Sequence, residues 1–302
     1  MKKISLGFSN FWGNSGGFTA EYFFRMFPFL KPFYNITVRQ DDDVDFMLYS
    51  VYGYVQKQAP NAVRVLISGE AGDHFEEGGK MAPGVYELGF YHYGLTCASK
   101  NPRKNHAYFP QPLLMLNLYN DGWKSLIRDD SPPPEKTRFC DFIYSNGNSM
   151  VRRYFCSLLK HYRWVDCAGA VDRNCNDLVG TGYDGPGYLA KQAFQSKHKF
   201  SIAFENNYFP GYTTEKLSDP LVARSVPIYS GNPDVDNLFN PEAFICVDNF
   251  DDHLSAIDYI RAVDNSDKLY NLHLNAPPFR NNKIPDQYSD EFYIDFMRGI
   301  FG

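Results

Sequence analysis

The chain has 302 residues, of which 44% are hydrophobic and 22% are charged, and its mean hydropathy is -0.41. This length favours two domains, since globular domains usually hold about 100 to 200 residues. The composition excludes a disordered tail protein, a collagen and a multispan membrane protein. The 30 basic and 35 acidic residues give a net charge of -5 without basic runs, so no nucleic-acid partner is expected.

Six cysteines are scattered without the spacing of a zinc site, and we expect buried free thiols. The first ten residues, MKKISLGFSN, lack a sustained apolar stretch and a small-residue cleavage site, which indicates a first strand rather than a signal peptide. No window approaches about 18 consecutive apolar residues, so no membrane-spanning segment is expected. These features predict a cytoplasmic protein and leave peripheral membrane contact and oligomeric state open.

Short apolar runs alternate with helical patterns in the N-terminal part of the chain. A glycine-rich turn over 13–17 leads to a helix that begins near Thr19, a good N-cap residue, and runs through Met26. The strands predicted here span 4–8, 35–38, 45–50 and 62–68. Because strands that alternate with helices form parallel sheets, residues 1–125 are predicted to be an α/β domain.

The composition changes near residue 121, and residues 129–136, DDSPPPEK, combine three prolines with dense charge. We interpret 126–137 as an interdomain linker or a long surface loop. A second alternation predicts an α/β domain over 138–285, followed by a C-terminal helix in 286–302 that we expect to pack back on the first domain. The strands predicted in this half span 139–145, 164–167, 199–205, 226–230 and 244–247, and the helices span 149–161, 187–195, 214–224, 251–263 and 290–301.

Residues 204–217, FENNYFPGYTTEKL, form the most informative segment. A buried strand runs into a polar loop, and a helix then begins with Thr213 or Thr214 as its N-cap. Ligands of α/β proteins bind beyond the carboxyl ends of strands, and helix N-termini hold anions. Lys216, in the first turn, is therefore placed for a diphosphate and Glu215 for a ribose hydroxyl. Taken alone, the segment also fits a capped surface helix with a solvated Glu–Lys pair.

A series of motifs resembles the donor-binding signature of the α-1,3/4-fucosyltransferases, above all their bacterial branch. The series is FEN, seven residues, then TEK, followed by VPIYSGNP at 226–233 and FICVDNF at 244–250. The resemblance covers about 139–250 and extends more thinly to the N-terminal half. It implies the α/β architecture called GT-B, in which two Rossmann-like domains face each other across a cleft.

The same resemblance implies an activity in glycan biosynthesis, such as that of bacterial lipopolysaccharide. The donor is GDP-β-L-fucose, and L-fucose passes with inversion to an acceptor glycan that contains galactose or N-acetylglucosamine, in α-1,3 or α-1,4 linkage. Carried over residue by residue, the family's donor contacts fall on Lys216 for the pyrophosphate, Glu215 for the ribose, and Asn206 and Tyr212 for the nucleotide-sugar.

The family's second pyrophosphate cation is an arginine that opens a helix after a strand and an Asn-rich loop. The run YSNGNSMVR at 144–152 places Arg152 there, with the adjacent Arg153 as the alternative. Two cations offset the charge of a leaving diphosphate, so no cofactor is required, and a divalent metal such as Mn²⁺ is expected at most to stimulate. The Asp-x-Asp pattern within 41–45 is a rival metal signal, which we interpret as a solvated acidic turn.

Inverting transfer also requires a carboxylate that takes the proton of the acceptor hydroxyl. Family members carry Gly-Glu at the end of an N-terminal strand, and Ser68-Gly69-Glu70 resembles it, so Glu70 is the predicted general base, with Asp73 as the fallback. The side chains predicted to contact the acceptor are Trp12, Tyr91 and His92.

Other functions stay open at this point. A GT-B transferase with a different nucleotide-sugar would share these motifs, and a catalytically inactive glycan-binding protein would keep the fold without turnover. A glycosidase fits less well, because it needs two carboxylates at one site and Glu70 has no convincing partner.

Overall fold

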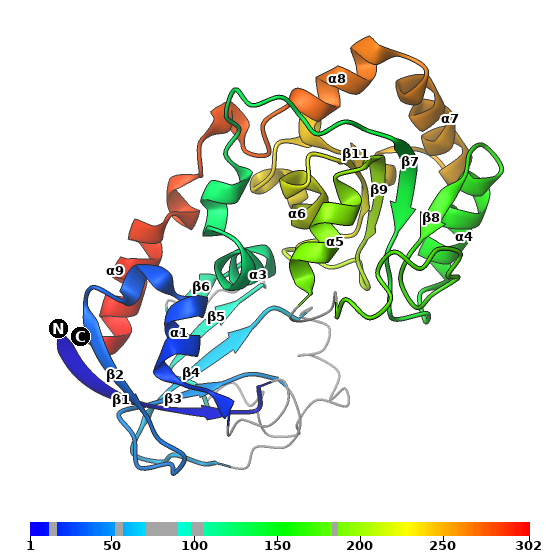
Figure 1. Cartoon of the computed structure of the whole chain (residues 1–302). Helices are drawn as coiled ribbons and strands as arrows, with labels where there is room; N and C mark the ends of the chain where they lie inside the picture. Colours follow the sequence, from blue (N-terminus) through cyan, green and yellow to red (C-terminus); the bar gives the residue numbers. More distant parts are fainter. Residues whose placement is uncertain (12–16, 52–56, 71–89, 98–104, 183–186) are drawn as a thin grey trace. The chain divides into compact units, whose positions relative to one another are not determined.

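The computed structural model describes residues 1–11, 17–51, 57–70, 90–97, 105–182 and 187–302 (Figure 1). The chain divides into two compact units. Unit 1 comprises Met1–Trp123, Phe209–Tyr212 and Ile284–Gly302, and unit 2 comprises Lys124–Tyr208 and Thr213–Lys283. Each unit contains one parallel β-sheet with its own buried core.

The sheet of unit 1 has the strand order β2-β1-β3-β4-β5-β6, and each neighbouring pair is parallel. The strands are β1 (Lys2–Ser9), β2 (Tyr34–Val38), β3 (Phe46–Tyr49), β4 (Val63–Ser68), β5 (Tyr93–Thr96) and β6 (His106–Tyr108). The first four confirm the sequence prediction within two residues at each end. The last two were not predicted, because they are only four and three residues long and each includes a half-buried residue without clear alternation.

Helices α1 (Ala20–Met26), α3 (Gln111–Tyr119) and α9 (Asp290–Phe301) belong to unit 1. The backbone N–H of Tyr22 donates to Thr19 Oγ1 over 3.1 Å, which confirms the predicted N-cap of α1. The phenyl ring of Phe301, in α9, lies 4.7 Å from that of Phe46 in β3, between ring centroids. The C-terminal helix is therefore part of the aromatic core of this unit.

The sheet of unit 2 has the order β8-β7-β9-β10-β11 and is also parallel throughout. The strands are β7 (Arg138–Phe142), β8 (Val165–Cys167), β9 (His198–Phe204), β10 (Val226–Ser230) and β11 (Ile245–Cys246). The helices are α4 (Met150–Lys160), α5 (Tyr188–Gln195), α6 (Glu215–Val222), α7 (His253–Asp264) and α8 (Asp267–Asn275). All except α8 confirm predicted elements. Strand β7 ends three residues earlier than the sequence indicates, β11 is two residues shorter and α6 is three residues shorter.

Strand order in unit 2 reverses between β7 and β9, because the chain first adds β8 on one side of β7 and then places β9 on the other side. In open parallel sheets, ligands bind beyond the carboxyl ends of the strands at such a reversal. The topology therefore directs attention to the loops that follow Phe142 and Phe204.

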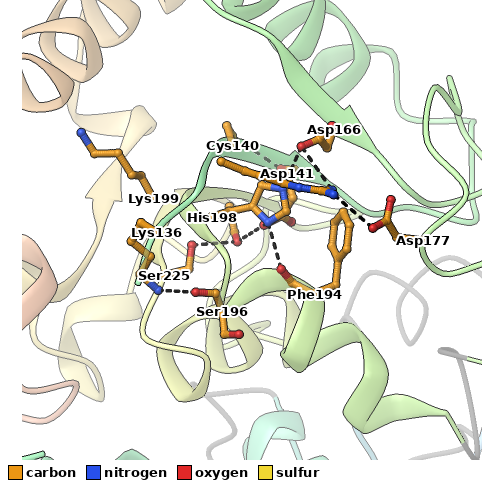
Figure 2. Close-up of polar contacts among 12 residues, drawn as sticks. Lys136, Cys140, Asp141, Asp166, Asp177, Phe194, Ser196, His198, Lys199 and Ser225 are labelled. Atoms are coloured by element: carbon orange, nitrogen blue, oxygen red, sulfur yellow. Dashed lines mark hydrogen bonds and ion pairs between the residues drawn. The ribbon is translucent and has the colours of Figure 1, made fainter. Parts of the chain in front are cut away.

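A buried polar cluster lies under α5, on one face of the unit 2 sheet (Figure 2). His198 Nε2 lies 3.0 Å from Asp166 Oδ2, and its Nδ1 lies 2.9 Å from the carbonyl oxygen of Phe194. Ser201 Oγ donates to Asp141 Oδ2 over 2.5 Å. Because His198, Asp141 and Ser201 are fully buried, we assign the cluster to tying β7, β8 and β9 together rather than to a ligand.

Leu126 ends the 3₁₀ helix Gly122–Leu126, and residues 127–137 form no helix or strand. This part of the chain belongs to unit 2, and Pro132 and Pro134 are exposed. Asn282 holds Arg128 through both side-chain amide atoms, with bonds of 2.8 and 2.7 Å to its backbone N–H and carbonyl. Lys136 Nζ donates to the carbonyl oxygen of Ser196 over 2.7 Å. This segment is thus attached to the second unit along its length.

All six cysteines lie in described residues and are free thiols, as predicted, but only four of them are buried, since Cys175 and Cys246 are partly exposed. Across the described part of the chain, no helix is long and apolar enough to cross a membrane.

Candidate active site

Arg152 enters the reversal point of the unit 2 sheet from the first turn of α4. Its guanidinium lies 4.2 Å from the ring centroid of Tyr144, and its side chain is fully buried. Nη1 donates to Asn206 Oδ1 over 2.8 Å, and Nη2 donates to the carbonyl oxygen of Asn146. The loop after β7 and the loop after β9 thereby hold one cation between them, and its orientation is fixed before any ligand arrives.

Tyr144 provides the platform for this cation and is itself fixed by backbone groups. Its hydroxyl donates to the carbonyl oxygen of Ile202 over 2.9 Å and accepts from the N–H of Phe204 over 2.7 Å. Burial raises the pKa of the Tyr144 phenol far above its ordinary value, so the ring stays neutral. A cation over the face of a buried neutral ring gains additional electrostatic stabilisation.

The neighbouring Arg153 has a different environment. Its guanidinium makes a two-fold contact with Asp172, with distances of 3.0 Å from Nε and 2.9 Å from Nη2, and 40% of its side chain is exposed. This surface ion pair engages two nitrogen atoms of the Arg153 guanidinium. Of the two arginines that the sequence left open, the geometry therefore favours Arg152 as the anion-facing cation.

Lys216 lies in the first turn of α6, where Thr214 is the N-cap and not Thr213. The Lys216 ammonium donates to Thr214 Oγ1 over 3.1 Å and lies 3.6 Å from a carboxylate oxygen of Glu215. Its side chain is 15% exposed, so the charge is largely desolvated yet reachable. The partial positive charge of the helix N-terminus adds to that of the ammonium, which suits an anion.

Glu205 is the buried acid of this site, and it was not among the residues predicted from the sequence. It follows β9 directly, and its carboxylate accepts from Thr214 twice, with 2.7 Å from the backbone N–H and 2.7 Å from Oγ1. Lys216 Nζ lies 3.6 Å from Oε2. Burial raises the pKa of Glu205 to about 7 against the opposing effect of the Lys216 charge. The available signal was its place in the FEN motif.

Asn206 and Tyr212 occupy different surroundings. Asn206 is exposed and orients Arg152, as described above. Tyr212 belongs to unit 1 and is only 3% exposed, packed in a small apolar cluster with Cys97, Tyr108 and Phe209. Its contact with a nucleotide-sugar stays a prediction.

Glu70 lies at the carboxyl end of β4 in unit 1, the position that Gly-Glu at a strand end predicts. It is half-buried; its N–H donates to Ser68 Oγ over 3.1 Å and its carbonyl accepts from Cys97 Sγ over 2.7 Å. Gly69 is required locally, since a Cβ there would lie 2.7 Å from Cγ of Gln111. The backbone around Glu70 is therefore held firmly, and its catalytic role stays a prediction. The fallback Asp73 lies outside the described residues.

Two of the predicted acceptor residues, Tyr91 and His92, belong to the described part of unit 1. His92 Nδ1 accepts from the backbone N–H of Arg64 over 2.9 Å, near the amino end of β4, and Tyr91 packs edge-on against Tyr49. Burial and the Arg64 charge lower the pKa of His92. Both side chains lie at the opposite end of β4 from Glu70, so their role in acceptor binding stays a prediction. Trp12 lies outside the described residues.

The acidic run at 41–45 forms a surface turn. Asp41 pairs with Arg39 at 3.1 Å, and Asp45 Oδ2 accepts from the N–H and the hydroxyl of Ser5 over 2.7 and 2.8 Å. Among the described residues, no group of three or more His, Cys, Asp or Glu side chains is arranged to hold a metal ion.

Known proteins resemble the chain in both sequence and fold. Residues 133–279 match the C-terminal domain of glycosyltransferase family 10 (fucosyltransferase). The chain is 31% identical over 179 residues to a putative fucosyltransferase of Acanthamoeba polyphaga mimivirus. The aligned region covers 58% of this chain and 29% of the viral protein. It is 35% identical over 144 residues to an α-(1,3)-fucosyltransferase of Helicobacter pylori, and this aligned region covers 48% of this chain and 28% of the Helicobacter protein. The predicted family resemblance is confirmed.

The fold comparison extends over nearly the whole chain. A crystal structure of an α1,3-fucosyltransferase with GDP-fucose aligns with a TM-score of 0.74 and 22% identity, covering 99% of this chain and 91% of that one. This match confirms the predicted GT-B fold with two Rossmann-like domains. The chain spans less than a third of the length of the viral and Helicobacter relatives.

The family 10 match separates the predicted residues into two groups. It includes the whole polar network at the reversal point, namely Arg152, Glu205, Asn206, Thr214, Glu215 and Lys216. Glu70 and the acceptor candidates precede it. The polar network at the reversal point therefore lies within the part of the chain that resembles the family 10 domain.

Proposed function

We propose that the chain is an inverting fucosyltransferase that uses GDP-β-L-fucose as donor. The observation that carries the proposal is the pair of cations at the reversal point of the unit 2 sheet: Arg152 is fixed over Tyr144, and Lys216 lies at the N-terminus of α6. A diphosphate needs positive charge and N–H donors at just such a place. The names of the relatives, which are fucosyltransferases, support fucose as the sugar.

In the proposed reaction, an acceptor hydroxyl oxygen attacks the anomeric carbon of fucose as the bond from that carbon to the β-phosphate oxygen breaks. The bonding electrons leave with GDP, and the configuration inverts. Arg152 and Lys216 stabilise the negative charge that grows on the departing diphosphate. Glu70 takes the proton of the acceptor hydroxyl as general base.

The other contacts in the proposal belong to the nucleotide. The Glu215 carboxylate, half-buried beside Lys216, bonds the ribose hydroxyls, while Asn206 and Tyr212 contact the nucleotide-sugar. With two cations facing the diphosphate, the reaction proceeds without a metal, and Mn²⁺ at most stimulates it.

A matched set of assays tests the proposal. The protein is incubated with GDP-fucose and with lactose, N-acetyllactosamine or a type I disaccharide, with and without EDTA. We expect GDP release that depends on acceptor, a fucosylated product whose linkage, α-1,3 or α-1,4, NMR identifies, and little loss of rate in EDTA. Turnover with UDP-galactose or GDP-mannose in place of GDP-fucose would point instead to a different nucleotide-sugar.

A catalytically inactive glycan-binding protein is the competing outcome. It predicts acceptor binding without GDP release from any donor, and binding that survives Glu70→Ala. Calorimetry with GDP alone separates this outcome from a wrong acceptor choice, because the cation pair predicts GDP binding even when no acceptor is present.

A further inference from the structure

We propose that Glu205 is a positioning residue for the donor diphosphate, which it serves by orienting the hydroxyl of Thr214 and, through it, the ammonium of Lys216. The inference rests on the proposed function, in which Lys216 faces the diphosphate. Glu205 itself is buried and is not expected to touch the donor.

The direction of the hydrogen bonds is fixed by chemistry. An ammonium and a backbone N–H can only donate, and both groups of Lys216 point at Thr214 Oγ1, with distances of 3.1 Å from Nζ and 3.3 Å from N. These two bonds use both lone pairs of the hydroxyl oxygen. The single hydroxyl proton must therefore go elsewhere, and Glu205 Oε2 accepts it at 2.7 Å.

The second oxygen of Glu205 has its own donor. Oε1 accepts a hydrogen bond from the backbone N–H of Thr214 over 2.7 Å. Both carboxylate oxygens therefore act as acceptors, which suits the ionised form of Glu205. It satisfies an N–H at the start of α6 and leaves the hydroxyl free to accept from Lys216. The three residues thus form a relay that holds the ammonium near the N-terminus of the helix.

A glutamine at position 205 cannot accept both bonds that Thr214 donates to Glu205, in either orientation of its amide. If its NH₂ faces Thr214 Oγ1, it competes with Lys216 for the lone pairs, and the hydroxyl proton is turned toward the ammonium. If its NH₂ faces the backbone N–H of Thr214, two donors meet. The substitution preserves size and shape, so it isolates the acceptor pattern and charge of Glu205 from packing.

Close packing around Glu205 explains why its position is precise. A Cβ at Gly231, whose φ is +154°, would lie 2.5 Å from Cγ of Glu205. The N–H of Glu205 donates to the carbonyl of Ser230 over 2.8 Å, which ties it to β10. The carboxylate is therefore aimed at Thr214 by its neighbours at the end of β10 and not by the ligand.

A double-mutant cycle tests the inference with Glu205→Gln, Lys216→Ala and the combination. We expect Glu205→Gln alone to raise the KM for GDP-fucose about tenfold and weaken GDP binding similarly. In the Lys216→Ala background we expect Glu205→Gln to change the KM for GDP-fucose and the affinity for GDP by less than about twofold more, because the ammonium that Glu205 orients is then absent. A tenfold effect in both backgrounds would overturn the proposal.

Thr214 provides a second test that does not depend on the folding of Glu205→Gln. Thr214→Val keeps the shape but removes the hydroxyl, and we expect it to weaken GDP binding about as much as Glu205→Gln. Thr214→Ser keeps the hydroxyl and is expected to recover most of that loss. If Val and Ser variants bind GDP equally, the hydroxyl does not transmit the effect and the inference fails.

Asp219→Asn is the matched control for general damage to α6. Asp219 is a buried carboxylate on the same helix, but it pairs with Lys191 of α5 at 2.8 Å. We expect this variant to lower Tm and to act additively with Lys216→Ala. Wild-type protein that binds no GDP would refute the proposed function itself, whereas GDP binding with an additive Glu205 cycle refutes only the relay.

Discussion

The two α/β units share a topology but differ in what occupies the carboxyl ends of their strands. Both sheets reverse strand order next to their first strand. In unit 2, this edge carries a buried cation, Arg152, that bonds Asn206, and a second group of bonded side chains made of Glu205, Thr214 and Lys216. In the described part of unit 1, the predicted base Glu70 is held through backbone bonds.

This difference teaches that the fold alone does not make a site. A diphosphate requires charges whose cost of desolvation has already been met in the folded protein, so its site is built from a network. A general base needs only a correctly placed carboxylate with access to a hydroxyl. The following experiments would break or sharpen this contrast.

The largest effect is expected at Glu70. Glu70→Ala removes the proposed proton acceptor, so we expect kcat to fall by about 10³-fold or more, with GDP affinity nearly unchanged because unit 2 retains its cations. Steady-state kinetics and calorimetry measure the two quantities. Full transferase activity in this variant would rule out Glu70 as the base.

The next effect is expected from the two cations. Lys216→Ala and Arg152→Ala should each lower kcat/KM for GDP-fucose by about 10²-fold, since both stabilise charge that grows in the transition state. Arg153→Ala is the control, and it should stay within about twofold of wild type because Arg153 pairs with Asp172. Equal losses in all three variants would show that the geometry does not distinguish the arginines.

A smaller effect should appear in the pH dependence of the donor KM. Glu205 faces Lys216 and Glu215 of α6, Tyr229 of β10 and Tyr144 of the loop after β7. Its pKa of about 7 means that it gains a proton as pH falls from 8 to 6, and a protonated carboxyl can no longer accept twice. We expect the KM for GDP-fucose to rise about threefold to tenfold over this range.

The diphosphate of GDP-fucose does not titrate between these pH values, so the substrate adds no slope of its own. Glu205→Gln should show a high KM that changes little with pH. A wild-type slope that persists in the Gln variant would assign the titration to another group.

The same group gives an effect on stability. Because burial raises the pKa of Glu205 from 4.5 to about 7, its contribution to stability is fully present below pH 4.5 and is lost as pH rises through 7. Between pH 5 and 8, wild type should therefore lose on the order of 2 kcal/mol more than Glu205→Gln. Urea unfolding at both pH values provides the measurement, and parallel losses would contradict the assigned cause.

The smallest effect is expected for His92. Its ring accepts a backbone N–H at the amino end of β4, away from Glu70. We expect His92→Ala to leave the acceptor KM within about twofold and to lower Tm slightly. A large rise in acceptor KM would restore its predicted role.

Much of the molecule could be predicted from local pattern. Long apolar runs and helix caps predicted four strands of unit 1 and every strand of unit 2, because these elements combine strong propensity with clear boundaries. Strand β5, strand β6, helix α3 and helix α8 were missed, since their patterns are short or mixed. The cysteines were predicted as free thiols from spacing alone, and they are.

The amino-acid sequence by itself determined the two α/β units, the family resemblance and the candidate cations, namely Lys216 and one of the neighbours Arg152 and Arg153, because motif spacing encodes the order of strand, loop and helix. Only the tertiary structure decided that Arg152 and not Arg153 faces the reversal point, since the two differ by one position on a helix. It also decided the part played by Glu205. The burial of that carboxylate and its two bonds to Thr214 depend on segments nine residues apart meeting in space.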